Sequence, residues 1–184
     1  RSLAALSYYN DEYYKNENEI NAKTNIDRKI YGFDSFEGLS ETEDHPRWSV
    51  NLFKYNHSYH PTIKNNELVT PTTVENFFSF NKLKKPIIIK SYFDKLNIDM
   101  IDKIALCHID CDLYSSTKQV LNLIKDKLVN GSILMFDDWF HYKGDHSKGE
   151  QKAVSEFLDE NKNIKINDFE RYGTFCKAFI VNIL

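Results

Sequence analysis

Two apolar runs of this chain end in neighbouring carboxylates. The runs span residues 104–109 and 131–136, and the acids that follow them are Asp110, Asp112, Asp137 and Asp138. If both runs are buried strands of a parallel sheet, their carboxyl ends meet at the edge where open α/β sheets build binding sites. Carboxylates gathered there are costly to keep ionised without a partner. We therefore expect a divalent cation with oxygen ligands, or a strongly perturbed pKa.

Asp110, Asp137 and Asp138 are the expected metal ligands, because two neighbouring strand ends place their carboxylates around one shared site. In the alternative interpretation, Asp137 and Asp138 only cap the loop and helix that follow. Two acidic strand ends in succession favour the metal site. Asp112 could share it or cap the helix that begins near residues 115–117, and capping is the interpretation we favour.

A proton acceptor is expected beside such a metal. A hydroxyl that chelates Mg²⁺ has a lowered pKa, so a neighbouring carboxylate can act as general base, and we assign that role to Asp110. His108 could serve instead, although a histidine inside an apolar strand is more often a core group. His141 and His146 lie on a polar loop and could contact substrate or only solvent. We take His141 as the second catalytic candidate.

The three cysteines, Cys107, Cys111 and Cys176, form an odd set without framework spacing. This argues against a disulfide-stapled secreted domain. Cys107, His108 and Cys111 could suggest zinc, but side chains alternate along a strand and His108 then faces away from both thiols. We predict reduced thiols that act as small core residues.

Apolar periodicity predicts the elements that position these residues. Helices are expected at 3–14, 74–80, 117–128 and 150–161, and strands at 29–33, 86–90, 104–109, 131–136, 164–169 and 176–183. This alternation is typical of an α/β sandwich with a mostly parallel sheet between helices. A turn at 171–173 predicts a C-terminal antiparallel hairpin. The irregular stretch 40–71 is predicted to be an insertion that forms a lid over the acceptor.

Composition excludes several classes of protein. The 184 residues are 41% hydrophobic and 28% charged, which predicts one domain over residues 1–184. A net charge of -3 without a dense basic stripe argues against nucleic-acid binding. The apolar stretches are strand-sized and no signal pattern opens the chain, so we expect a cytoplasmic protein without a membrane span. Whether it forms a homo-oligomer is left open.

Four motifs in order resemble the class I S-adenosylmethionine-dependent O-methyltransferases of the macrocin and mycinamicin type (TylF/MycF). They are residues Phe33–Leu39, Tyr92–Leu96, His108–Thr117 and Gly131–Trp139. The resemblance implies a Rossmann-like sheet and methyl transfer to a sugar hydroxyl of a glycan precursor or glycosylated small molecule. It also implies Mg²⁺ at Asp110, Asp137 and Asp138, with Asp110 as base.

The same resemblance implies how the methyl donor binds. Asp34 would hold the ribose hydroxyls of S-adenosylmethionine, although from its position after a strand Asp34-Ser35 could equally cap a turn. The implied cofactor-binding positions are Ser2, Asp34, Ser35, Tyr92, Phe93, His108 and Asp110. The family carries a first, central strand and a glycine-rich loop before the helix that matches Arg1–Leu6. We therefore expect this chain to be a fragment that lacks them.

Two alternatives stay open at this stage. The sequence Asp110-Cys111-Asp112 after an apolar run also fits the Asp-x-Asp motif of a metal-dependent glycosyltransferase, but that motif gives no role to Asp137, Asp138 or Asp34. The other alternative is a non-catalytic remnant of a methyltransferase.

Overall fold

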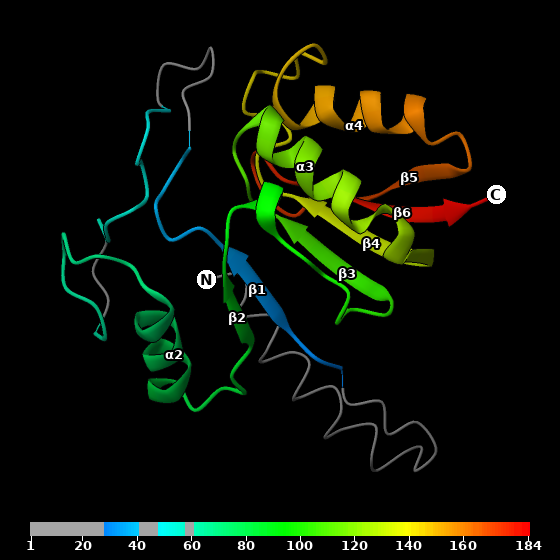
Figure 1. Ribbon diagram of the computed structural model, residues 1–184. Coiled ribbons are helices and arrows are strands. Elements are labelled where there is room, and N and C mark those ends of the chain that lie inside the picture. Colours follow the sequence, from blue (N-terminus) through cyan, green and yellow to red (C-terminus); the bar gives the residue numbers. More distant parts are fainter. Residues whose placement is uncertain (1–27, 41–47, 58–60) are drawn as a thin grey trace. The chain divides into compact units, whose positions relative to one another are not determined.

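The computed structural model describes residues 28–40, 48–57 and 61–184. The described residues fall into two compact units, residues 28–92 with those gaps and residues 93–184. Each is described by itself, and Figure 1 labels their elements. The helix expected at 3–14 lies outside the described residues, and a single domain over residues 1–184 stays a prediction.

The first unit contains a pair of parallel strands and one helix. β1 (Tyr31–Asp34) pairs with β2 (Ile87–Lys90). Helix α2 (Pro71–Phe80) begins three residues before the predicted start. Thr70 and Thr73 explain this, because each side-chain oxygen accepts a hydrogen bond from the other residue's amide, at 3.2 and 2.8 Å. A proline at the first helical position suits the same start.

Part of the predicted insertion is fastened to the loop that follows β1. The Leu39 amide donates to the Leu52 carbonyl at 3.0 Å. Gly38 has φ +73°, and a Cβ there would lie 2.3 Å from the Leu52 oxygen, so only glycine fits. Glu37 accepts from Lys54 at 2.7 Å and from Lys90 at 2.9 Å. The described residues 48–57 and 61–70 form turns and include an isolated bridge between Tyr55 and Leu68, as expected for an irregular segment. Its role as a lid stays a prediction.

The second unit is a four-stranded sheet with two helices. Its elements are β3 (Ile104–Ile109), α3 (Tyr114–Ile124), β4 (Leu128–Phe136), α4 (Gly149–Glu160), β5 (Ile164–Glu170) and β6 (Lys177–Ile183), with short 3₁₀ turns at Phe93–Lys95 and Lys125–Lys127. The strand order is β3-β4-β6-β5. β3 and β4 are parallel, whereas β6 is antiparallel to both of its neighbours. The predicted C-terminal hairpin is confirmed, and the sheet is mixed because β6 lies between β4 and β5.

The boundary between α3 and β4 differs from the predicted one. The sequence predicts a helix over 117–128, but α3 ends at Ile124 and Leu128 opens β4. Leu128 is buried as a residue of the strand. The register between β3 and β4 shifts near the start of β4, where the Ser132 hydroxyl donates to Ile104 O at 2.6 Å and accepts from Val129 N at 2.9 Å. Ser132 thus hydrogen-bonds to backbone groups that the irregular ladder leaves unpaired.

The core of the second unit fixes the carboxyl ends of β3 and β4. Helices α3 and α4 pack against each other, and Glu156 of α4 accepts from Tyr114 Oη and Lys118 Nζ of α3, both at 2.6 Å. Phe136, at the end of β4, is fully buried, and its ring lies 5.2 Å from that of Trp139 and 5.9 Å from that of Phe179. The turn after β4 is therefore held by aromatic packing.

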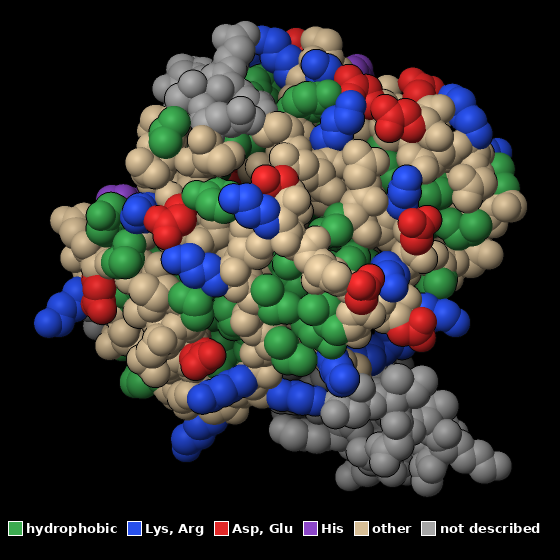
Figure 2. All heavy atoms as spheres, viewed as in Figure 1, with side chains coloured by type: hydrophobic (Ala, Val, Ile, Leu, Met, Phe, Trp, Pro, Cys, Tyr) green, Lys and Arg blue, Asp and Glu red, His purple; other side chains and the backbone are tan. Residues whose placement is uncertain are grey.

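The surface agrees with the balanced composition. Figure 2 shows basic and acidic side chains interspersed over the face that it draws. Among the described residues, no helix has both the length and the apolar character needed to cross a membrane.

Candidate functional site

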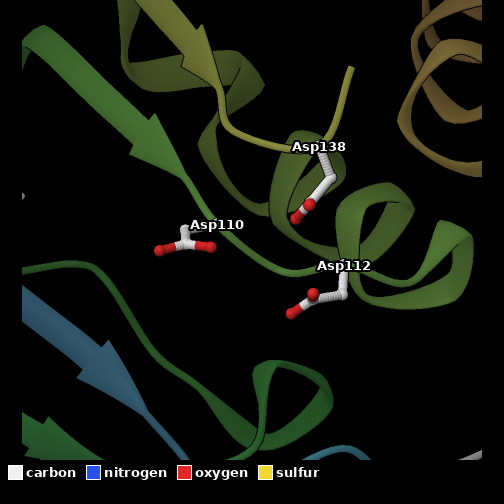
Figure 3. Close-up of side chains that lie close together, drawn as sticks. All are labelled: Asp110, Asp112 and Asp138. Carbon is white, nitrogen blue, oxygen red and sulfur yellow. The ribbon is translucent and has the colours of Figure 1, made fainter. Parts of the chain in front are cut away.

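Three acids of the second unit converge at the carboxyl ends of β3 and β4. One carboxylate oxygen each of Asp110, Asp112 and Asp138 lies within 4.8 Å of the others. In Figure 3, Asp110 follows β3, Asp112 precedes α3 and Asp138 follows β4, and their carboxylates face a common space. Such a set of hard oxygen donors suits Mg²⁺ or a similar divalent cation. We name these three residues the acidic cluster.

Asp138 is the buried member of the cluster. Its side chain is 6% exposed, Oδ1 contacts His141 Nδ1, and the buried Oδ2 has no hydrogen-bond partner among the described residues. Burial raises the pKa of Asp138 to about 6; His141 opposes this shift, and Asp110 and Asp137 add to it. A buried carboxylate oxygen without a partner is costly, so a ligand of positive charge fits this position.

His141 is positioned by Asp138 and by an aromatic ring. The His141 amide donates to the Asp138 carbonyl at 3.0 Å, and its imidazole stacks on Phe175 with the ring centres 4.6 Å apart. The structure thus places this predicted catalytic residue against the acidic cluster. A histidine in this position orients the carboxylate that it contacts.

Asp137 lies outside the acidic cluster, because consecutive side chains along an extended chain point to opposite sides. Its Oδ1 is 3.5 Å from His108 Nε2 and accepts from the Cys176 thiol at 3.3 Å. Tyr172 Oη lies 3.5 Å from the same His108 nitrogen. A second set of polar side chains therefore lies at this sheet edge, formed by Asp137, His108, Cys176 and Tyr172.

The first turn of α4 reaches back to the turn that carries Asp138. Glu150 is 1% exposed, and its Oε2 accepts from the Asp138 amide at 3.0 Å. Gln151 is 5% exposed, and its Nε2 donates to the Trp139 carbonyl at 2.6 Å. Burial raises the pKa of Glu150 well above its ordinary value, and the neighbouring carboxylate of Asp138 adds to the shift.

In the first unit, the predicted cofactor residues follow β1 and β2. Asp34 Oδ1 accepts from the Phe36 amide at 2.5 Å, and Ser35 Oγ accepts from the Glu37 amide at 3.2 Å. Desolvation raises the pKa of Asp34, and the Phe36 amide partly offsets it. The Ser91 amide donates to the Asp34 carbonyl at 3.0 Å, which brings Tyr92 to the same strand edge. The turn-forming role of Asp34-Ser35 is thus seen directly.

The other predicted cofactor residues lie elsewhere in the chain. Phe93, His108 and Asp110 belong to the second unit, and Ser2 lies outside the described residues. Cofactor binding by these positions stays a prediction.

Three of the residues around the cluster were not singled out from the sequence. Glu150 and Gln151 act on a turn 12 residues earlier, across a polar loop whose path no periodicity reveals. Tyr172 belongs to the predicted turn at 171–173, and no sequence pattern directs it towards His108. The alternation of side chains beyond β4 does, however, predict that Asp137 and Asp138 face opposite ways.

A family model for the macrocin O-methyltransferases (TylF) matches residues 17–177. This chain belongs to the TylF family. The family inferred from the four motifs is therefore confirmed. The match covers both units and both acidic strand ends, and it favours a methyltransferase over the glycosyltransferase alternative.

Two solved structures are similar to this chain. The O-methyltransferase NovP superposes with a TM-score of 0.58 at 20% identity, over 85% of this chain and 61% of NovP. CalS11, described as a TDP-rhamnose 3'-O-methyltransferase of calicheamicin biosynthesis, gives 0.49 at 20% identity, over 83% of this chain and 58% of CalS11. This chain thus spans about three fifths of their length. NovP supports the Rossmann-like methyltransferase fold. No curated protein matches the chain in sequence.

Proposed function

We propose that the protein is an S-adenosylmethionine-dependent, Mg²⁺-dependent O-methyltransferase that acts on a sugar hydroxyl. The acceptor class is a glycan precursor or a glycosylated small molecule. One observation carries the proposal: in a chain of the TylF family, the buried Asp138 keeps a carboxylate oxygen without a partner beside Asp110 and Asp112. We expect action in the cytoplasm on small molecules and not on nucleic acid.

Asp110 and Asp138 are the proposed core of the metal site. Their donor atoms are carboxylate oxygens, and the unpartnered Asp138 Oδ2 is the atom that a cation would satisfy. Bound there, Mg²⁺ would supply Lewis acidity that lowers the pKa of an acceptor hydroxyl. His141 holds Asp138 through its Nδ1, and the resulting orientation supports ligation by Asp138.

The third carboxylate is either Asp112 or Asp137. The spacing within the acidic cluster supports Asp112. The family resemblance implies Asp137, whose Oδ1 instead accepts from the Cys176 thiol. Mn²⁺ titration of D112N and D137N decides between them: the variant with the larger loss of affinity identifies the ligand.

Asp110 is proposed as the general base. It is the exposed member of the cluster, so an acceptor hydroxyl can reach it. A carboxylate beside a bound cation takes the proton of a hydroxyl whose pKa the cation has lowered. On the donor side, we propose that Asp34 accepts the ribose hydroxyls of S-adenosylmethionine, as the resemblance implies.

The test is methyl transfer by the full-length protein. S-adenosylhomocysteine formation is measured with nucleotide-linked sugars and glycosylated small molecules, in Mg²⁺ or in EDTA. We expect turnover that EDTA abolishes and Mg²⁺ restores, and a kcat of D110N reduced by about 10²- to 10⁴-fold. The matched control is D159N, an exposed aspartate of α4 paired with Lys162.

Three outcomes would contradict the proposal. Equal turnover in EDTA and in Mg²⁺ would show that methyl transfer does not depend on a metal. Transfer of the sugar in place of a methyl group would revive the glycosyltransferase alternative. Binding of S-adenosylhomocysteine without any turnover across the acceptors would support the non-catalytic remnant.

A further inference from the structure

Glu150 is a buried carboxylate without an obvious structural reason. Its side chain is 1% exposed, and among the described residues no lysine, arginine or histidine forms an ion pair with it. One oxygen, Oε2, accepts from the Asp138 amide at 3.0 Å, and the other, Oε1, has no partner in the same part of the chain. Burying such a group costs stability, and an apolar side chain of similar volume would fill the space at lower cost.

Glu150 accepts its hydrogen bond from the backbone of Asp138, the buried member of the acidic cluster. The Asp137 amide donates to the Ile109 carbonyl at 3.0 Å and so continues the β3–β4 ladder, but the Asp138 amide has left the ladder. Glu150 accepts from that amide, and the next residue of α4, Gln151, binds the Trp139 carbonyl. The consecutive side chains of Glu150 and Gln151 therefore hydrogen-bond to the backbone before and after the Asp138 carbonyl carbon.

We infer that Glu150 is a positioning residue that fixes the Asp138 backbone and thereby directs the Asp138 carboxylate at the bound cation. The inference rests on the proposed function, because it presumes a cation at the acidic cluster. Groups that orient a metal ligand without touching the metal change metal affinity by about 10- to 100-fold. The role that counts is acceptance of one hydrogen bond, so an amide oxygen at residue 150 should preserve it.

The test compares three variants of the full-length protein by calorimetric Mn²⁺ titration. E150Q keeps an oxygen that accepts from the Asp138 amide, whereas E150M keeps the volume and removes the acceptor. F157L is the control, since Phe157 is a core residue of the same helix, 3% exposed. Its substitution lowers stability by about 1 kcal/mol without touching the turn.

We expect E150M to raise the Kd for Mn²⁺ by about 10- to 100-fold, with E150Q and F157L within about threefold of the wild type. Hydrogen exchange of the Asp138 amide should be faster in E150M than in E150Q. If E150M does not fold, E150D takes its place, because its carboxylate is one methylene too short and should show the same loss.

Other outcomes overturn the inference. Wild-type affinity in E150M, or in E150D as its substitute, shows that Glu150 does not position the ligand. If E150Q binds Mn²⁺ as weakly as E150M, the negative charge of Glu150 matters and not its capacity to accept a hydrogen bond. A wild-type protein that binds no Mn²⁺ overturns the proposed metal site and the inference together, whereas the first two outcomes leave the metal site standing.

Discussion

The two strand edges that carry the predicted site residues satisfy their polar groups in different ways. In the first unit, Asp34 Oδ1 and Ser35 Oγ accept from backbone amides two residues ahead, so each makes a local turn. In the second unit, Asp138 Oδ2 and Glu150 Oε1 are buried without partners among the described residues.

This difference separates two uses of the same chemistry. A carboxylate that accepts hydrogen bonds from its own loop stabilises the backbone and needs no cation. A buried carboxylate oxygen without a partner is tolerated when something else completes it, such as a cation. This difference supports the proposed metal site at the edge of β3 and β4, and we expect no metal at the edge of β1 and β2.

The largest effect is expected from D138N, compared with D34N. Loss of the buried charge should weaken Mn²⁺ binding by at least about 100-fold, because a ligand contributes more than the groups that orient it. D34N should leave the affinity unchanged. Mn²⁺ calorimetry on both variants measures this, and an equal loss in D34N would break the comparison.

The pH dependence of stability should have opposite signs for Asp138 and for Glu37, which lies in the loop after β1. Burial raises the pKa of Asp138 from 3.8 to about 6, so the folded chain binds a proton more tightly than the unfolded chain. Its contribution is complete below about pH 4 and is lost as the pH rises through 6, a change of about 3 kcal/mol. Hydrogen bonds from Lys54 and then Lys90 lower the pKa of Glu37 to about 2. Its contribution is present above about pH 4.5 and is lost as the pH falls towards 2.

Melting temperatures in EDTA, measured from about pH 2 to about pH 8 so that both groups titrate within the range, test these signs. The difference between wild type and D138N should fall with rising pH, and the difference between wild type and E37Q should rise. Slopes of the same sign in both would contradict the assignment.

A smaller and separate effect is expected from G38A. The substitution forces alanine into φ +73° and places its Cβ against the Leu52 oxygen. The neighbouring hydrogen bond from the Leu39 amide to the Leu52 carbonyl should therefore be weakened. The free energy of unfolding should drop by about 1–3 kcal/mol. Urea unfolding measures this. Unchanged Mn²⁺ affinity in the same variant would sharpen the comparison, whereas a loss like that of D138N would show that the two edges are coupled.

The strands beside the acidic cluster could be predicted because the pattern that indicates them lies within a few consecutive residues. Two apolar runs of strand length, each followed by acids, were enough to place Asp110 and Asp138 at neighbouring strand ends. Helical periodicity over 117–128 is enough to predict α3, in which Val120 and Leu121 are buried. The four motifs, in their order along the chain, were enough to predict the family.

The remaining features depend on contacts that are not local. The position of β6 between β4 and β5 is a choice among topologies, and hairpin pairing with β5 alone would satisfy the same pattern. Glu150 reaches Asp138 only because α4 docks beside α3. The start of α2 could have been predicted, since Thr70-Pro71 with Thr73 is a recognisable cap.

The irregular start of β4 has a consequence for how relatives can differ by insertion or deletion. Around Ser132 the ladder already contains extra residues, so a residue gained or lost between Leu128 and Ser132 is absorbed there. From Ile133 to Phe136 the strand is paired on both sides. A length change in that stretch would exchange the directions of Asp137 and Asp138 and leave the wrong acid facing inward. Gaps in homologous sequences should therefore collect between Leu128 and Ser132 and be absent from Ile133 to Phe136.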